Sequence, residues 1–173
     1  MSKLSLIVST FFIIAFVSCK KDTTGSKSSY LKMKVNGVAK QYDSCHTLEI
    51  QQSLGGNEVY YQVNILSGKP GDYAGVGVTG LEPVTKKMYL STGQTPDDEG
   101  LVAFIGAYRE PGSTSIYDSF DSQNNYYADN VNVTITEWND EYAIGTFSGE
   151  MKLVGGDKKL TITEGEFKAS RGQ

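Results

Sequence analysis

From residue 30 onward, the chain alternates apolar and polar residues in short runs that glycine-rich turns separate. Residues 31–35, 59–65 and 131–136 show this alternation most clearly. A period of two places successive side chains on opposite faces of a β-strand, so each run predicts a strand with one face toward a core. No stretch in this part of the sequence carries a sustained apolar stripe with the 3.6-residue period of a helix. The pattern therefore predicts an all-β domain.

Turn sequences between the runs indicate how the strands connect. Asn36-Gly37 favours a two-residue hairpin, because both central residues of a type I′ turn need a positive φ. Further turns are expected at 68–71, 139–141 and 155–157. Strand-like runs that recur about every 8 to 12 residues are typical of sandwiches and barrels. We predict an antiparallel β-sandwich or partly closed β-barrel of about eight to ten strands.

Two runs near the end of the chain change parity. In 142–154 the apolar residues are even at Ile144 and odd at Phe147, and in 160–168 they are even at Ile162 and odd at Phe167. Glycines lie beside both changes. An extra residue that reverses the facing of a strand is a β-bulge, and glycine accommodates it readily. We expect a bulge in each run.

The N-terminus has the pattern of a secretion signal. A basic start at Lys3 precedes the apolar run 4–16, which is too short to span a bilayer comfortably. Ser18 then stands directly before Cys19, as in the bacterial lipoprotein motif whose cysteine receives acyl chains such as palmitate. The expected organisation is a signal peptide at 1–18, a lipidated cysteine and flexible tether at 19–29, and a single all-β domain at 30–173. An ordinary cleaved signal and an uncleaved anchor remain alternatives.

Three short motifs in the domain carry a resemblance to known proteins. They are Val35-Asn36-Gly37, Gly145-Thr146-Phe147-Ser148 and Glu164-Gly165-Glu166-Phe167. Together with the lipoprotein start, they resemble a group of small β-rich lipoproteins of Bacteroidota with no assigned activity. The resemblance covers the first hairpin and residues 131–168, supports the fold and the compartment, and transfers no functional residue. It implies an outer-membrane lipoprotein, and the start Lys20-Lys21-Asp22 leaves both a periplasm-facing and a cell-surface position open.

Residue types suited to catalysis are scarce. His46 is the one histidine and neighbours Cys45, but adjacent residues of a regular strand point to opposite faces, so the two cannot form a dyad. We expect His46 to be partly buried and hydrogen-bonded, and Cys45 to be a free structural thiol, with an intermolecular disulfide or a redox role as the alternatives. No zinc-ligand spacing or phosphate-binding glycine loop is present, so no cofactor is expected. A net charge of −4 argues against a nucleic-acid partner.

The segment around Tyr126 and Tyr127 is the candidate ligand site. Asn124, Asn125 and Asp129 lie beside the two tyrosines, and this mixture of amide, acid and aromatic groups suits sugar hydroxyls. Tyr60 and Tyr117 are further candidates for such a stacking surface. The oxygen-rich stretch 118–129 is also an alternative calcium site, although it lacks the glycine and the terminal glutamate of an EF-hand loop.

Three functions follow from these observations. The leading hypothesis is a lipid-anchored, non-enzymatic binding or accessory module of the cell envelope, held to the membrane by its anchor. The second is a protein that binds a glycan or small ligand through Tyr126 and Tyr127. The third is a structural partner of another envelope protein, docked through an exposed strand edge. An enzyme that uses paired carboxylates is a more remote alternative.

Overall fold

The computed structural model describes residues 28–55, 58–91, 102–109, 111–121, 126–128 and 130–172. Within these ranges the regular structure is entirely β. The strands are β1 (Tyr30–Val35), β2 (Val38–Tyr42), β3 (Cys45–Gly55), β4 (Glu58–Lys69), β5 (Asp72–Gly80), β6 (Met88–Leu90), β7 (Val102–Arg109), β8 (Ile116–Asp118), β9 (Phe120–Asp121), β10 (Tyr126–Tyr127), β11 (Asn132–Trp138), β12 (Tyr142–Leu153) and β13 (Lys159–Ser170).

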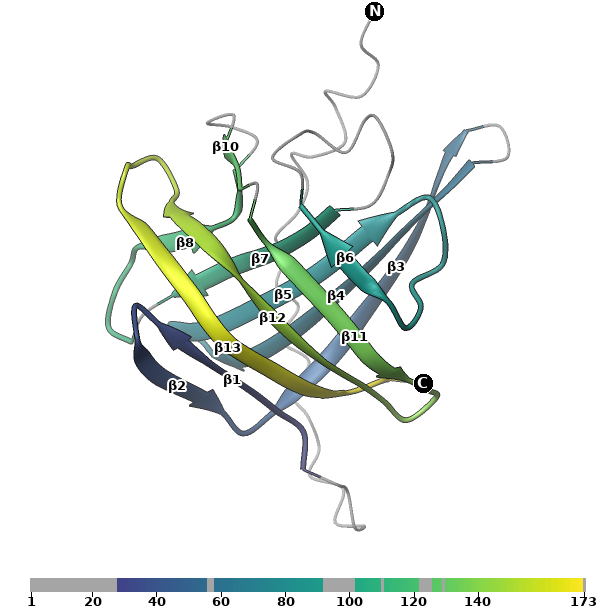
Figure 1. Cartoon of the computed structure of the whole chain (residues 1–173), viewed down its shortest axis with the longest axis horizontal. Coiled ribbons are helices and arrows are strands. Elements are labelled where there is room, and N and C mark those ends of the chain that lie inside the picture. Colours follow the sequence, from purple (N-terminus) through teal and green to yellow (C-terminus); the bar gives the residue numbers. More distant parts are fainter. Residues whose placement is uncertain are drawn as a thin grey trace, which may run out of the picture.

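Eleven of these strands form one sheet that folds over on itself, and β9 and β10 form a separate pair. In Figure 1 the sheet divides into two layers whose strands cross. The front half-sheet has the order β2-β1-β13-β12-β11-β6, and the back half-sheet has the order β3-β4-β5-β7-β8. Every pairing within each half-sheet is antiparallel.

The two half-sheets join at two corners. At one corner β12 pairs with β8 through two residue pairs, and at the other β13 meets β3 in parallel through the single pair Ser170 and His46. These links close a ring of hydrogen-bonded strands that is too weakly joined to be a regular barrel. The predicted fold class, a sandwich or partly closed barrel, is therefore confirmed. The described residues contain thirteen strands rather than about eight to ten, and four of them, β6, β8, β9 and β10, have only two or three residues.

The first hairpin forms where the turn sequence predicts it. Asn36 has φ 48° and Gly37 has φ 81°, as a type I′ turn requires. The register then pairs Val35 with Val38 and Lys32 with Gln41. At the far end of the hairpin, the Tyr42 hydroxyl donates a hydrogen bond of 3.2 Å to Asp72 Oδ1 in β5. This bond fastens the edge of the front half-sheet to the back half-sheet.

The core fills the space between the half-sheets. Leu31, Met33 and Val35 point inward from the front, and Val76 and Val78 point inward from the back. Burial of apolar area contributes about 25 cal/mol per Å². Burial of the inward-facing side chains that the alternation provides therefore stabilises the packing of the two half-sheets.

Two Gly-x-Phe motifs pack against each other at the centre of the front half-sheet. Gly145 pairs with Phe167, and Phe147 pairs with Gly165, so each ring lies over the glycine of the neighbouring strand. A Cβ atom on Gly145 would lie 2.5 Å from the Phe167 ring, and one on Gly165 would lie 2.7 Å from the Phe147 ring. The ring centroids are 6.4 Å apart. The motifs behind the resemblance to lipoproteins thus have a packing role in this chain.

Of the two predicted bulges, the structure contains the one in β13. Glu164 adopts φ 51°, and the registers with both β1 and β12 shift there, so β13 carries one extra residue. The expected parity change in β12 is wrong, because its buried positions alternate without interruption from Ala143 to Met151. Ile144 is half-buried on the outer face. Its apolar side chain alone suggested a core position.

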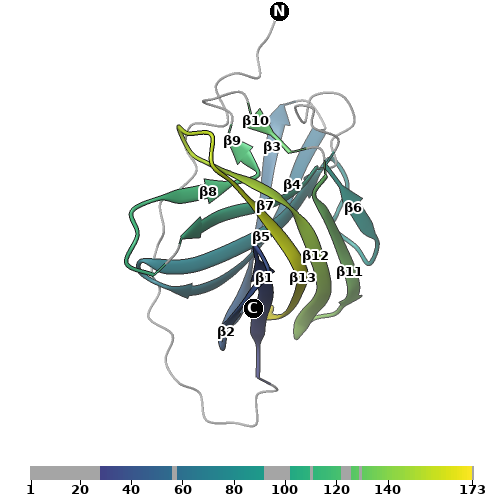
Figure 2. The same cartoon turned by 60° about the vertical axis from the view of Figure 1, so that its left-hand side comes forward.

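The beginning of the domain and the β9–β10 pair lie at opposite ends of the molecule. In Figures 1 and 2, β1 begins at the bottom of the view and β10 lies at the top. Ser29, directly before β1, accepts a 3.2 Å hydrogen bond from the Cys45 amide through its hydroxyl oxygen. The chain therefore enters the fold beside the corner between β3 and β13.

Candidate functional site

Two adjoining hollows lie on the outer face of the hairpin formed by β1 and β2. The first has a volume of about 490 Å³ and is lined by Ser28, Ser29, Tyr30, Lys32, Gln41 and Asp43. The second has a volume of about 240 Å³ and is lined by Lys32, Met33, Lys34, Ala39, Lys40, Gln41, Glu164 and Glu166. They share Lys32 and Gln41, and we call the two together the outer groove.

Strand periodicity and register place the side chains of the outer groove. Tyr30, Lys32 and Lys34 share the outer parity of β1, opposite to the buried residues of the same strand. Register brings Lys32 between Gln41 of β2 and Glu166 of β13. A residue of the third strand therefore completes a site that the hairpin begins.

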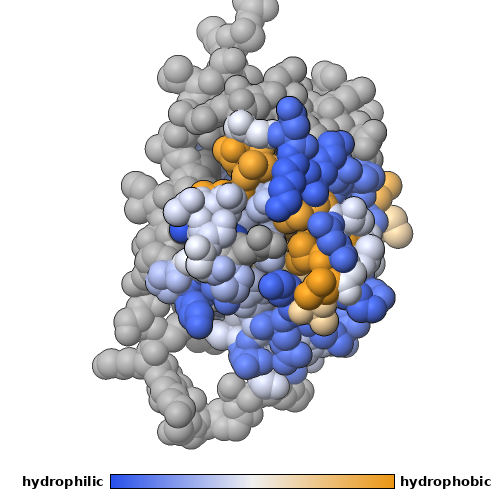
Figure 3. All heavy atoms as spheres, turned by 90° about the vertical axis from the view of Figure 1, so that its left-hand side faces the viewer, coloured by the Kyte–Doolittle hydropathy of each residue, from blue (hydrophilic) through white to orange (hydrophobic). Residues whose placement is uncertain are grey.

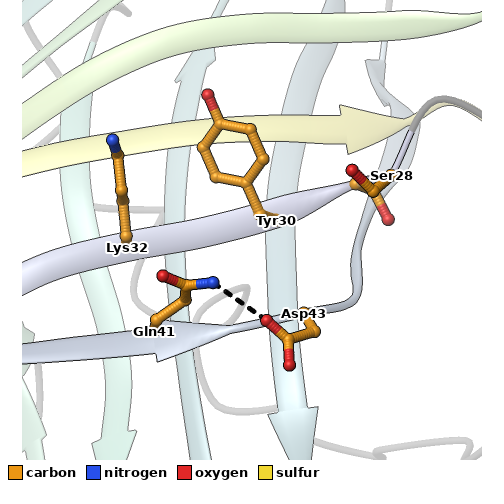
Figure 4. A pocket seen from close by; sticks show the side chains of 6 residues that line it. Ser28, Tyr30, Lys32, Gln41 and Asp43 are labelled. Atoms are coloured by element: carbon orange, nitrogen blue, oxygen red, sulfur yellow. Dashed lines mark hydrogen bonds between the residues drawn. The ribbon is translucent and has the colours of Figure 1, made fainter.

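Figure 4 shows the arrangement in the first hollow. Tyr30 and Lys32 rise in parallel from β1, and the Lys32 ammonium lies 5.7 Å from the centre of the Tyr30 ring. Below them, Gln41 Nε2 donates a 3.0 Å hydrogen bond to Asp43 Oδ1. The first hollow thus combines an aromatic ring with amide, hydroxyl, carboxylate and ammonium groups.

Charge pairs cross the groove from β1 to β13. Lys32 Nζ lies 2.9 Å from Glu166 Oε2, and Lys34 Nζ lies 2.7 Å from Glu164 Oε1. The hydrogen bond from Lys32 to Glu166, together with the negative charge of that carboxylate, raises the pKa of Lys32 above its ordinary value. The bulge at Glu164 helps to place the Glu164 carboxylate beside Lys34. The positive charges of Lys32 and Lys34 are therefore balanced by carboxylates on the neighbouring strand.

Cys45 and His46 lie on opposite faces of β3, as predicted. The Cys45 thiol is buried, and burial raises its pKa to about 12. The expectation that His46 is partly buried is wrong, because the residue is exposed. His46, Leu48 and Ile50 do share one face, but the outer one, and Leu48 is 47% exposed. Thr47 and Cys45 occupy the inward positions instead.

The predicted ligand segment falls largely outside the described residues. Tyr126 pairs with Asp121 and Tyr127 pairs with Phe120 through their backbones in β10 and β9. The side chains of Tyr126 and Tyr127 lie outside the described residues, as do Asn124, Asn125, Asp129 and the predicted lipidation site Cys19. Whether these side chains form one site stays a prediction.

Tyr117 cannot belong to an exposed stacking surface, which corrects the sequence-based proposal. It is 2% exposed and packs beside Tyr108, with 6.3 Å between the ring centroids. Both tyrosines point into the core at the end of β7 and the start of β8. The tyrosine content of the chain therefore serves packing as well as surface chemistry.

The described ranges contain no group of three or more His, Cys, Asp or Glu side chains that could hold a metal ion. The alternative calcium site at 118–129 lies partly outside those ranges and remains a prediction. The described residues also contain no helix long and apolar enough to cross a bilayer.

The sequence interpretation missed the outer groove. Tyr30, Gln41 and Asp43 have no distinctive motif, and their grouping depends on the register of the first hairpin. A two-residue turn at Asn36-Gly37 does predict that Lys32 and Gln41 lie side by side. This half of the groove could therefore have been predicted from the sequence. The contribution of Glu164 and Glu166 required the long-range pairing of β1 with β13.

Comparison with known proteins returns no match. No family model matches the chain, no curated protein matches it, and no solved structure matches it.

Proposed function

We propose that the protein is a lipid-anchored, non-enzymatic lipoprotein of the bacterial envelope that works as a binding or accessory module through its outer groove. The observation that carries this proposal is the position of the groove at the start of β1, where the domain follows the expected tether. An aromatic ring and several hydrogen-bonding groups converge there on a rigid strand scaffold. Such a combination suits recognition of a ligand.

The environments of the two most reactive side-chain types support a binding role over catalysis. A nucleophilic cysteine needs a lowered pKa and access to substrate, whereas Cys45 is buried and its pKa is raised. His46 points away from it on the other face of β3. The lysines and glutamates of the groove form ion pairs with each other, and their N–H groups and carboxylate oxygens can also hydrogen-bond to a ligand.

The lipid anchor is tested with Cys19→Ser in a bacterial host that processes lipoproteins. The unchanged chain should incorporate labelled palmitate and sediment with membranes, and the variant should do neither. Cys45→Ser is the matched control and should behave like the unchanged chain. Palmitate incorporation that persists in Cys19→Ser would refute the proposed anchor.

Two further measurements test the location and the absence of activity. An epitope after Gln173 that protease removes from intact cells places the domain on the cell surface, and removal only after lysis places it in the periplasm. Hydrolysis of a glycan or ester by the purified protein, abolished by one acidic substitution, would show that the non-enzymatic assignment is wrong.

A glycan site at Tyr126 and Tyr127 is the second candidate function. The position of β10 at the end of the molecule opposite to the start of β1 favours it, because an anchored domain would present that end away from the membrane (Figure 2). Replacement of both tyrosines by Ala should then weaken glycan binding by about 0.5–1.5 kcal/mol per stacked pair. Unchanged affinity would exclude this segment.

Docking of a partner strand on the free edge of β2 is less well supported. Lys40 pairs with Met33 and therefore points toward the inner side of this edge strand. An inward-pointing charge on an edge strand is a common device against pairing with another chain. The surface in Figure 3 also shows its apolar patches interrupted by hydrophilic residues. Neither feature favours a broad protein interface on this side.

A further inference from the structure

We propose that the outer groove binds a neutral oligosaccharide that lies extended along β1. This inference rests on the proposed function of a binding module and names the ligand class of the same groove. It differs from the alternative at Tyr126 and Tyr127, because that segment and the groove occupy opposite ends of the molecule (Figures 1 and 2).

The charge balance of the groove favours a neutral ligand. Lys32 and Lys34 face the groove together with the carboxylates of Asp43, Glu164 and Glu166, whereas Lys40, which also lines it, has the inner parity of β2. Lys32 and Lys34 are already within 3 Å of Glu166 and Glu164. A charged ligand would have to compete with these pairs for the lysine or glutamate that it bound, whereas a neutral ligand leaves them intact.

The hydrogen-bonding groups of the groove suit hydroxyls. A sugar hydroxyl both donates and accepts, so it can bond to a carboxylate oxygen and to an amide or ammonium N–H at once. The pair of Gln41 and Asp43 offers an amide donor and a carboxylate acceptor side by side. Lys32 and Glu166 offer an ammonium donor and a carboxylate acceptor where β1 pairs with β13.

The Tyr30 ring supplies the apolar part of the site. The ring is half-buried on the outer face, in parallel with Lys32 (Figure 4). An aromatic ring beside polar groups can stack against the C–H face of a sugar while the polar groups bind its hydroxyls. This division matches the two chemical faces of a pyranose ring.

The shape of the groove favours a chain over an enclosed small molecule. The two hollows adjoin at Lys32 and Gln41 and follow β1 from Tyr30 to Lys34, a distance of about 13 Å at 3.3 Å per residue. Both lie on the outer surface of the sheet, where a bound chain could continue beyond either end. Small-molecule sites more often enclose most of their ligand.

The test uses the purified full chain in detergent micelles. Calorimetric titrations with hexasaccharides of glucose, xylose and mannose should give binding with at least one of them, unchanged within about twofold between low and high salt because no ion pair forms. A hyaluronan hexasaccharide tests an anionic ligand, and an extended β-strand peptide tests edge pairing. Binding of only the hyaluronan or the peptide would overturn the inference.

Variants locate the site. Tyr30→Ala should weaken binding of the neutral oligosaccharide by about tenfold, and Gln41→Ala by about threefold to tenfold, whereas Tyr30→Phe keeps the ring and should stay within about threefold. The double variant Tyr126→Ala, Tyr127→Ala is the matched control and should bind normally. Thermal unfolding of each variant shows that the fold is kept. Loss of binding in the double variant alone would show that the oligosaccharide binds at β10, and would overturn the inference that it binds in the outer groove.

The outcomes separate this inference from the proposed function. A lipid-anchored protein that binds no neutral oligosaccharide disproves the inference and leaves the binding module in place. A protein that hydrolyses the oligosaccharide disproves the non-enzymatic function, even where Tyr30→Ala weakens its binding.

Discussion

The long ladder between β12 and β13 and the corner between β13 and β3 hold the same strand in place by different means. β12 and β13 share ten residue pairs, whereas β13 and β3 share one. Side chains make up the difference at the corner. Arg171 makes two hydrogen bonds to Glu49, at 2.7 and 3.0 Å, and its guanidinium lies 4.0 Å from the Trp138 ring. Backbone pairing thus secures β13 to β12, and individual polar contacts secure the end of β13 to β3.

Serine hydroxyls complete the corner. Ser170 Oγ donates to the Cys45 carbonyl at 3.2 Å, Ser67 Oγ donates to the Ser44 carbonyl, and Ser29 Oγ accepts from the Cys45 amide. Each contact depends on one small side chain in one rotamer. A ladder tolerates many substitutions because its bonds are in the backbone, whereas this corner depends on the residues themselves. The comparison predicts that substitutions in the ladder and at the corner will differ in two ways. They will change the free energy of unfolding by different amounts, and they will affect different numbers of strands.

The largest effect is expected inside the ladder. Phe167→Ala removes a fully buried ring that covers Gly145, and should lower the free energy of unfolding by about 3–5 kcal/mol. Urea unfolding followed by fluorescence measures it. Thr161→Ala, an exposed position on the same strand, is the control and should change stability by less than about 0.5 kcal/mol. Equal effects would contradict the packing role of the ring.

Loss of Arg171 should weaken the corner and leave the ladder intact. Arg171→Ala removes a partly exposed ion pair and a stacked guanidinium, which together contribute about 1–2 kcal/mol. Arg171→Lys keeps the charge without the two-point contact and should fall between the two proteins. Hydrogen exchange should increase in β3 and stay unchanged in β12. Uniform deprotection of both strands would show that the corner and the ladder unfold as one unit.

Alkaline pH should destabilise the fold through the thiol at the corner. The pKa of Cys45 is raised from 9.0 to about 12 in the folded protein, so above pH 9 the unfolded chain loses a proton that the folded protein keeps. The stabilising contribution is complete below pH 9 and falls as pH rises toward 12, with a loss of about 1.4 kcal/mol by pH 10. Cys45→Ala should flatten this slope in urea titrations at several pH values. Tyr42→Phe removes another buried group with a raised pKa, but its ordinary pKa is a unit higher, so it should reduce the loss by pH 10 by only about 0.4 kcal/mol.

The smallest effect is expected on the outer surface of the front half-sheet. Lys34→Ala removes one exposed ion pair with Glu164 and should change the free energy of unfolding by about 0.5 kcal/mol or less. The difference should shrink further in high salt, because screening weakens exposed charge pairs. A loss above about 2 kcal/mol would assign Lys34 a structural role that its exposure does not suggest.

The ladder was predictable from the sequence, and the corner was not. Alternation and the turn at 155–157 define β12 and β13, since both act between neighbouring segments of the chain. The corner joins residues 45–49 to 170–171, more than 120 positions apart, and no periodicity encodes such a pairing. The direction in which a side chain faces was also ambiguous where apolar residues lie on an outer face, as at Leu48 and Ile144. The β13 bulge could be found because Gly165 and the change of parity coincide.

For the candidate site too, the sequence reveals local features but not the long-range pairing of strands. The Tyr126 segment was selected by composition alone, and composition does not report which side chains converge. The outer groove has ordinary residues at ordinary positions and becomes a site only through register, with Glu164 and Glu166 supplied from the far end of the chain. Binding surfaces on sheets are therefore harder to detect in a sequence than the turns that shape them.

The hydrogen bond from the Cys45 amide to Ser29 has a mechanical consequence. If the chain before Ser28 is fixed to a membrane, any pull on the domain is applied at Ser29, beside the corner with one backbone pair. Tyr30 and Lys168 are the first pair of β1 with β13 after Ser29, so a load directed away from the end of β13 reaches this pair first and separates the two strands pair by pair. The ten pairs between β12 and β13 carry load only afterwards. Tension on the tether would thus deform the outer groove before it unfolds the core.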